Sequence, residues 1–149
     1  MPSPTSQKTL LYVSELAEGE APSVVGAITK AARVSNANRG IGGLLIFDGA
    51  RFAQMLEGPP DCIDDLLLKL QADARHTNMS VLDLSGLNGP VRFKGWGLGF
   101  LLLEDEDQGI LLLSTRTGED AITTFLTLSS MADVDADVGV VFRPQASPS

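Results

Sequence analysis

The chain is poor in the residues that carry disulfide and metal chemistry. Among its 149 residues it has one cysteine, Cys62, and one histidine, His76. A lone cysteine forms no internal disulfide, and one cysteine with one histidine makes no cluster of soft metal ligands. We therefore expect neither an oxidising compartment nor a structural zinc site, and we assign no metal to the functional site.

Basic residues and long apolar runs are also scarce. Eleven lysine and arginine residues stand against nineteen aspartate and glutamate residues, which gives a formal net charge of -8. Such a chain repels nucleic acids and anionic membranes. No apolar run approaches the ~18 residues of a membrane span, and the polar start at 1–9 lacks the apolar core of a signal peptide. The sequence thus predicts a cytoplasmic protein with no nucleic-acid or membrane partner.

What the chain does have is enough apolar material for one folded domain. Hydrophobic residues make up 44% of the sequence. A chain of this length buries roughly two thirds of its unfolded surface. The ends at 1–7 and 143–149 are rich in proline and serine, so we predict flexible tails there.

A hairpin is predicted over 41–58, where two apolar runs flank Asp48 and Gly49. If these two residues form the turn, Phe47 faces Ala50 across the strands. The hairpin is the element around which the rest of the chain is organised.

Gln54 is out of place in this hairpin. The predicted register sets it opposite Gly43 on an apolar face. A buried primary amide without partners costs on the order of 1 to 3 kcal/mol. Two explanations stay open at this point: another buried side chain satisfies the amide, or a flat ligand with a polar edge occupies the space above Gly43.

The remaining elements complete a ferredoxin-like α+β sandwich. The order is strand, helix, two hairpin strands, helix, strand and strand, which places two helices on one face of a mixed sheet. Ser23 is a plausible cap of the first helix and Pro60 begins the second. Outside the hairpin, the predicted strands cover 10–14, 79–84 and 96–102. The predicted helices cover 24–35 and a stretch from 59 that ends with Asp73, Arg75 and His76.

The opposite face of the sheet also needs a cover. On the hairpin, the side chains that point away from Gln54 are apolar as well: Leu44, Ile46, Ala53 and Met55. The apolar run 110–113, and a helix that follows the capping pattern at 117–120, are suited to cover them. We interpret 103–142 as an extension with two helices on that face. A homo-oligomeric contact would serve the same purpose, and the sequence does not separate the two.

Five motifs, in order and on the predicted elements, resemble the pattern of the BLUF family, blue-light sensors that use FAD. They are Tyr12-x-Ser14, Asn36 seven residues before Gly43, Gln54-x-Leu56-Glu57-Gly58, Asp73-x-Arg75-His76 and Arg92-Phe93-x-x-Trp96. The resemblance implies a flavin-binding photosensor domain over 8–102. It also implies that the isoalloxazine lies between the two helices and that the C-terminal helices lie on the other sheet face.

The resemblance also implies a set of cofactor-binding residues. An isoalloxazine presents carbonyls and ring nitrogens along one edge, so its pocket needs neutral amides and cationic donors. By the resemblance, Asn36 holds the C4 carbonyl and N3 edge, whereas Arg75 and His76 lie near the C2 carbonyl. Ile28 and Leu70 contact the ring faces, and the set is completed by Tyr12, Ser14 and Gln54. Taken alone, Asn36 reads equally well as a turn residue, and Arg75 and His76 as charges at a helix end.

Gln54 is the implied switch, because its amide has a donor end and an acceptor end that rotation or tautomerisation exchanges. Tyr12, the only tyrosine, is the implied donor of an electron and then a proton, and a red-shifted flavin band is the implied result. Trp96 is a competing electron donor. Two positions depart from the usual pattern: Gly42 replaces a common threonine, and Leu98 replaces a common methionine on the strand that passes the signal on.

Other functions stay open at this stage. We expect no catalytic residues, because the sequence shows no nucleophile and base at a recognisable spacing. The alternatives are a small acylphosphatase-like enzyme on the same fold and an interaction module without flavin. For the sensor, the resemblance to short single-domain members implies a homo-oligomer, dimeric or higher, that signals to an unidentified protein. The predicted ring contacts suit FAD, FMN and riboflavin alike; the family favours FAD.

Overall fold

A computed structural model describes residues 7–87, 91–93, 97–103, 109–130 and 141–143 of the chain. The elements follow one another as β1 (Gln7–Leu16), α1 (Val24–Asn38), β2 (Gly42–Phe47), β3 (Arg51–Gly58), α2 (Pro60–Ala72), β4 (His76–Leu87), β5 (Gly99–Leu103), α3 (Gly109–Leu113), α4 (Gly118–Ser130) and β6 (Val141–Arg143).

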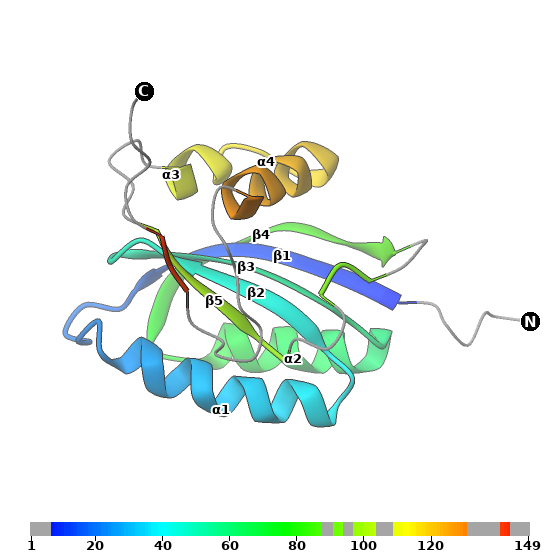
Figure 1. The fold of residues 1–149 in the computed structure, drawn as a ribbon, viewed down its shortest axis with the longest axis horizontal. Coiled ribbons are helices and arrows are strands. Elements are labelled where there is room, and N and C mark those ends of the chain that lie inside the picture. Colours follow the sequence, from blue (N-terminus) through cyan, green and yellow to red (C-terminus); the bar gives the residue numbers. More distant parts are fainter. Residues whose placement is uncertain (1–6, 88–90, 94–96, 104–108, 131–140, 144–149) are drawn as a thin grey trace, which may run out of the picture.

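The strands form one mixed sheet in the order β4-β1-β3-β2-β5-β6. β3 is antiparallel to both β1 and β2, and β1 is antiparallel to β4, whereas β2–β5 and β5–β6 are parallel pairs. Helices α1 and α2 are the two crossovers and cover one face, while α3 and α4 lie on the other (Figure 1). The predicted ferredoxin-like α+β sandwich, with two C-terminal helices on the opposite face, is confirmed.

The two large helices begin and end where local chemistry favours it. Pro60 opens α2, with Asp61 in the first turn, and Asp73 is the C-terminal cap residue. In α1, Ser23 does occupy the capping position, but its side chain makes no capping hydrogen bond, so the predicted cap is wrong in its chemistry. The backbone carbonyl of Asn36 accepts hydrogen bonds from the N–H groups of Arg39 and Ile41, which closes the last turn of α1.

The hairpin is present, but its register differs from the predicted one. Phe47 faces Phe52 rather than Ala50, and Gln54 faces Leu45 rather than Gly43. The reason lies in the turn: the Asp48 carboxylate accepts hydrogen bonds from the N–H groups of Ala50 and Arg51, and the Asp48 N–H donates to the carbonyl of Arg51, so the turn is centred on Gly49 and Ala50. A shift of two residues changes every partner but keeps every side chain on its predicted face.

Each sheet face has its own buried cluster. The side chains on the hairpin that point away from Gln54 pack with Ile110, Leu113, Ile122 and Phe125 of the C-terminal helices. The cluster on the other face contains Tyr12, Leu45, Phe52 and Leu98 and packs against α1 and α2. The alternation of strand side chains thus divides the molecule into two cores.

Two features near the C-terminus differ from the sequence expectation. β5 begins at Gly99 rather than at 96, and the short strand β6 was not predicted at all. Trp96 lies outside the described residues, so its predicted role stays a prediction. Among the described residues, no helix has both the length and the apolar character needed to cross a membrane.

Candidate functional site

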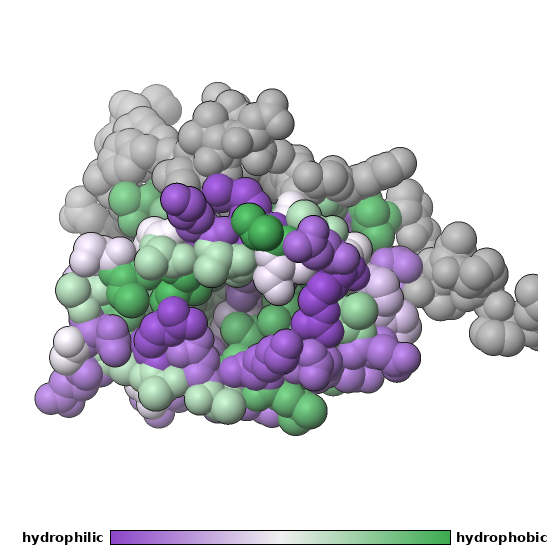
Figure 2. All heavy atoms as spheres, turned by 90° about the horizontal axis from the view of Figure 1, so that it is seen from below, coloured by the Kyte–Doolittle hydropathy of each residue, from purple (hydrophilic) through white to green (hydrophobic). Residues whose placement is uncertain are grey.

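A cavity opens between α1, α2 and the sheet. It holds about 550 Å³ that no protein atom occupies, part of it open to solvent. Figure 2 views the molecule from the side of α1 and α2 and shows hydrophobic residues in the hollow and hydrophilic residues around it. The cavity is lined by Tyr12, Ile28, Ala32, Asn36, Leu45, Phe52, Gln54, Leu56, Leu66, Leu70, Asp73, Arg75, His76 and Leu98. A largely apolar wall with a few polar groups is typical of a site for a small molecule.

Tyr12 and Gln54 meet at the floor of this cavity. They face each other across β1 and β3, and their side chains are 3% and 5% exposed. The phenolic O–H of Tyr12 donates a hydrogen bond to Oε1 of Gln54. At the other end of the amide, Nε2 has no hydrogen-bond partner among the described residues. Another buried side chain therefore satisfies half of the amide, and its donor half borders the cavity.

Burial keeps the Tyr12 phenol protonated. Desolvation raises the pKa of Tyr12 well above its usual value, and the negative charge of Asp73 raises this pKa further. A phenol with a raised pKa is a hydrogen-bond donor at every physiological pH. Its bond to Oε1 therefore fixes which end of the Gln54 amide faces Tyr12.

His76 joins β1 to the end of α2. Its Nε2 lies 2.5 Å from the carbonyl oxygen of Leu70, and its Nδ1 lies 2.8 Å from Oγ of Ser14. A carbonyl only accepts, so Nε2 carries the proton and donates. The imidazole also meets the ring of Tyr12 edge-on, with the ring centroids 6.0 Å apart. His76 thus contacts the ring of Tyr12, and its own imidazole is held by Ser14 and by the carbonyl of Leu70.

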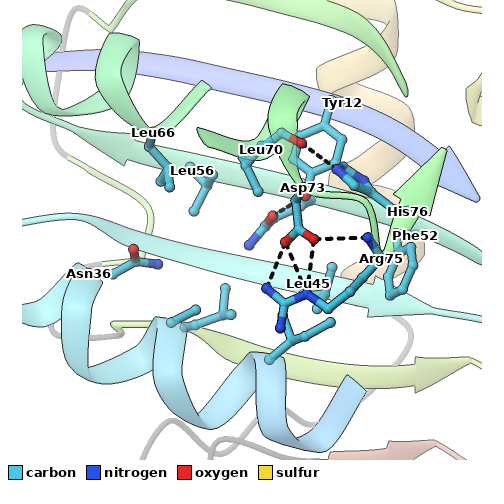
Figure 3. Close-up of a pocket in the computed structure, with 14 residues that line it drawn as sticks. Tyr12, Asn36, Leu45, Phe52, Leu56, Leu66, Leu70, Asp73, Arg75 and His76 are labelled. Carbon is cyan, nitrogen blue, oxygen red and sulfur yellow. Dashed lines mark hydrogen bonds and ion pairs between the residues drawn. The ribbon is translucent and has the colours of Figure 1, made fainter. Parts of the chain in front are cut away.

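Asp73 and Arg75 form an ion pair at the cavity. The guanidinium donates through Nε to Oδ1 at 2.9 Å and through Nη2 to Oδ2 at 2.7 Å, a two-pronged arrangement visible in Figure 3. The hydrogen bond from Arg75 is the largest cause of the lowered pKa of Asp73. Both side chains remain ionised, and the planar fork of Arg75 is held by its partner.

Asn36 reaches the cavity from the last turn of α1, and Figure 3 shows its side chain directed away from that helix toward the sheet. It is 3% exposed, and its Nδ2 donates to the carbonyl oxygen of Gly97 at 2.9 Å. Seven of the predicted cofactor-binding residues therefore line one cavity: Tyr12, Ile28, Asn36, Gln54, Leu70, Arg75 and His76. Ser14 is not in the lining, but its Oγ lies 2.8 Å from Nδ1 of His76, which lines the cavity.

Half of the residues that line the cavity were not among the predicted site residues. Asp73 was noticed as part of a motif but not as a site residue, although it lines the cavity. The spacing of the helical positions carried a usable signal, because Ile28, Ala32 and Asn36 recur every fourth residue. Period-two alternation from Gln54 would also have found Phe52 and Leu56.

A comparison with family models decides what this arrangement represents. The model described as sensors of blue-light using FAD matches residues 8–99, more than half of the chain. The chain belongs to the BLUF family. It is therefore a flavin-binding domain of a family of blue-light sensors, and the predicted family is confirmed.

Curated relatives carry the same domain inside much longer proteins. The photoactivated adenylate cyclase subunit beta of Euglena gracilis is 32% identical over 94 residues, which are 63% of this chain and 11% of that protein. The subunit beta of Euglena longa is 34% identical over 77 residues, 52% of this chain and 9% of that protein. The chain thus spans about a tenth of the length of these relatives.

Solved structures confirm the fold. Klebsiella pneumoniae BlrP1, in a structure with FMN and cyclic diGMP, has a TM-score of 0.65 and 28% identity, and the match covers 84% of this chain and 34% of that one. The dark-state structure of BlrB, described as a BLUF protein, has a TM-score of 0.69 at 24% identity and covers 84% of this chain and 96% of that one. At 24% identity the latter likeness is one of fold alone.

Proposed function

We propose that this chain is a blue-light photoreceptor that binds FAD in the cavity between α1 and α2. The observation that carries the proposal is the buried hydrogen bond from Tyr12 to Gln54, with the donor end of the same amide facing the cavity. FAD is preferred because the family description names it, and FMN is the alternative because it appears with BlrP1.

The residues around the cavity suit the isoalloxazine. Ile28 and Leu70 offer apolar contacts to the two ring faces from opposite helices. Asn36, Arg75 and His76 would serve the polar edge, with Asn36 at the C4 carbonyl and N3 and the other two near the C2 carbonyl. Ser14 completes the set through its contact with His76. Nε2 of Gln54 supports this fit, because it has no hydrogen-bond partner among the described residues and belongs to a residue that lines the cavity, where a ligand acceptor would satisfy it.

A bound flavin would supply blue-light absorption and, in its excited state, an acceptor for one electron and one proton. Tyr12 would supply that electron, and its phenolic proton would follow through the Gln54 amide, which would take up a proton at Oε1 along the existing hydrogen bond and release one from Nε2 to the bound ligand. The electron and the proton then return, so the phenol is regenerated while the amide has rearranged. Since rotation or tautomerisation exchanges what Gln54 donates and accepts, the cavity gains a different hydrogen-bond pattern without a buried charge. Trp96 is the competing electron donor.

The sensor signals through contacts rather than through a reaction of its own. We assign photosensing to 8–102 and cover of the sheet to 103–142. Of the predicted tails, Gln7 and Arg143 belong to β1 and β6, and 1–6 and 144–149 lie outside the described residues. We also propose a homo-oligomer, dimeric or higher, in the cytoplasm, with an unidentified downstream protein and with neither nucleic acid nor membrane as partner. The acidic balance of the chain supports the exclusion of nucleic acid.

The test is an absorption spectrum before and after illumination. Purified protein should be yellow, and blue light should shift its flavin band to the red with recovery in the dark. Tyr12→Phe and Gln54→Leu should leave the protein yellow and abolish the shift. Gln71→Leu, at an exposed position of α2, is the matched control and should keep it. A normal shift in both cavity variants would refute the mechanism.

The same purified protein also distinguishes the alternative cofactors and the alternative functions. Chromatography of the released cofactor distinguishes FAD, FMN and riboflavin. Colourless protein that refuses added flavin would favour an interaction module instead. Hydrolysis of an acyl phosphate, abolished by a cavity variant, would favour the acylphosphatase-like enzyme.

A further inference from the structure

The backbone carbonyl of Gly97 contacts Asn36, a residue that lines the proposed flavin site. It accepts the hydrogen bond from Nδ2 of Asn36 at 2.9 Å, and Asn36 is 97% buried at this point. The next carbonyl along the chain, that of Leu98, accepts a hydrogen bond from Nε of Arg33 at 3.2 Å. Residues 97 and 98 are thus fixed to α1 by two side chains, one of which lines the cavity.

This contact determines which way the Asn36 amide points. A backbone carbonyl only accepts, so the end of the amide that faces Gly97 must be the NH2. The carbonyl end, Oδ1, has no hydrogen-bond partner among the residues that the structure describes. It is left as an acceptor for the cavity, and the second N–H of the amide is left as a donor.

Gly97 holds this position because it has no side chain. A Cβ at residue 97 would lie 2.2 Å from the carbonyl oxygen of Arg33 and 3.3 Å from Cβ of Ala37. Backbone atoms of a helix interior do not give way as the end of a flexible side chain does. Any side chain at 97 therefore pushes this segment off α1 and moves its carbonyl away from Asn36.

We propose that Gly97 is a positioning residue of the flavin site: its carbonyl fixes the polarity of the Asn36 amide, which presents an acceptor beside a donor to the ligand. That pair complements a ring N–H next to a carbonyl, the imide edge of a flavin. Without the carbonyl of Gly97, the amide is free to turn over and to present two mismatched groups. The inference rests on the proposed flavin site and adds a specificity-determining contact to it.

The test combines flavin titration with the infrared C4 carbonyl stretch of the bound flavin. Gly97→Ala should weaken flavin binding about tenfold, the equivalent of about 1.4 kcal/mol. It should also raise the stretching frequency, because the carbonyl loses a well-aligned donor. Gly26→Ala is the matched control, because a Cβ there meets no atom within 4 Å.

A double-mutant cycle with Asn36→Leu separates positioning from general disruption. If Gly97 acts through Asn36, adding Gly97→Ala to Asn36→Leu should change flavin affinity less than twofold. Full additivity of the two changes would overturn the proposal. If wild-type protein binds no flavin, the proposed function fails; if it is yellow and Gly97→Ala behaves as Gly26→Ala does, only this inference fails.

A direct measurement covers the case in which Gly97→Ala does not fold. In wild-type protein labelled at asparagine nitrogen and glycine carbonyl carbon, NMR should detect scalar coupling between Nδ2 of Asn36 and the carbonyl of Gly97. Its presence supports the contact. Its absence in a spectrum that resolves both groups would overturn it.

Discussion

The two faces of the sheet are built from alternate residues of the same strands, yet they differ in how completely they are packed. On the face covered by α3 and α4, the side chains of Leu11, Met55 and Phe125 are fully buried. On the face covered by α1 and α2, similar strand residues border a cavity, and buried polar groups such as Tyr12 and Gln54 stand among them. One face is packed for stability and the other leaves room for a ligand.

Both faces bury polar groups, but the polar groups are satisfied in different ways. On the face covered by α3 and α4, Glu57 is 1% exposed and accepts hydrogen bonds from the side chain and the backbone N–H of Arg92. This pair is complete within the protein. On the cavity side, Gln54 and Asn36 each keep one amide end without a partner among the described residues. On the cavity face the groups without such a partner are amide ends of residues that line the cavity, whereas on the packed face, within the described part of the chain, the buried Oγ1 of Thr9 is the group that lacks one.

The largest expected effect tests the packed face. Phe125→Ala should lower the free energy of unfolding by about 3 to 5 kcal/mol, because it removes a fully buried ring and leaves a void. Leu66→Ala, at a half-buried position on the cavity wall, should cost only about 1 kcal/mol, since its side chain already borders open space. Urea unfolding of both variants measures the difference.

The same two variants also check whether the faces are separable in function. Folded Phe125→Ala should still give the red shift, because the Tyr12–Gln54 contact lies on the other side of the sheet. Equal losses of stability from both replacements would contradict the distinction between the faces.

The division into faces could be predicted from the sequence because it depends only on period-two alternation. The hairpin shows why this is robust: the turn centred on Gly49 and Ala50 shifted the register by two residues, and Gln54 stayed on its face. The cross-strand partner of Gln54 could not be predicted. The sequence pair Asp48-Gly49 favours a two-residue turn at these positions, but the hydrogen bonds accepted by the Asp48 side chain produce a different turn.

The site residues were predictable in kind but not in their contacts. Seven of them line one cavity because the fold brings β1, β3, α1, α2 and the residues that follow α2 together. The contacts of Asn36 with Gly97 and of His76 with Leu70 involve backbone carbonyls, which every residue has. No pattern of side-chain types reveals such a contact. Asp73 and Arg75 are two residues apart in the sequence, so their ion pair could have been predicted. Only the structure shows that this pair borders the cavity.

A second prediction concerns alkaline pH and the cavity face. An unfolded tyrosine loses its proton near pH 10, whereas the folded Tyr12 keeps it because its pKa is raised. Above pH 10 the unfolded state therefore binds fewer protons than the folded state. The titration of Tyr12 therefore leaves the free energy of unfolding unchanged below pH 10. Above pH 10 this free energy falls, by up to about 1.4 kcal/mol per pH unit.

Tyr12→Phe is the control for this measurement, because it removes the only tyrosine and leaves any titration of the cofactor in place. The difference in unfolding free energy between wild type and variant should be constant below pH 10 and decrease above it. A difference that stays constant to pH 11 would show that the folded phenol titrates like an unfolded one.

The smallest expected effect lies on the packed face. Oγ1 of Thr9 is buried, and among the described residues it has no hydrogen-bond partner. Thr9 pairs with Glu57 across β1 and β3, so its side chain belongs to the face of the C-terminal helices. Thr9→Val keeps the branched shape and removes the unpaired hydroxyl, and we expect it to stabilise the fold by about 1 kcal/mol. Destabilisation measured by thermal unfolding would mean that the hydroxyl does find a partner, so that the packed face satisfies this polar group within the protein.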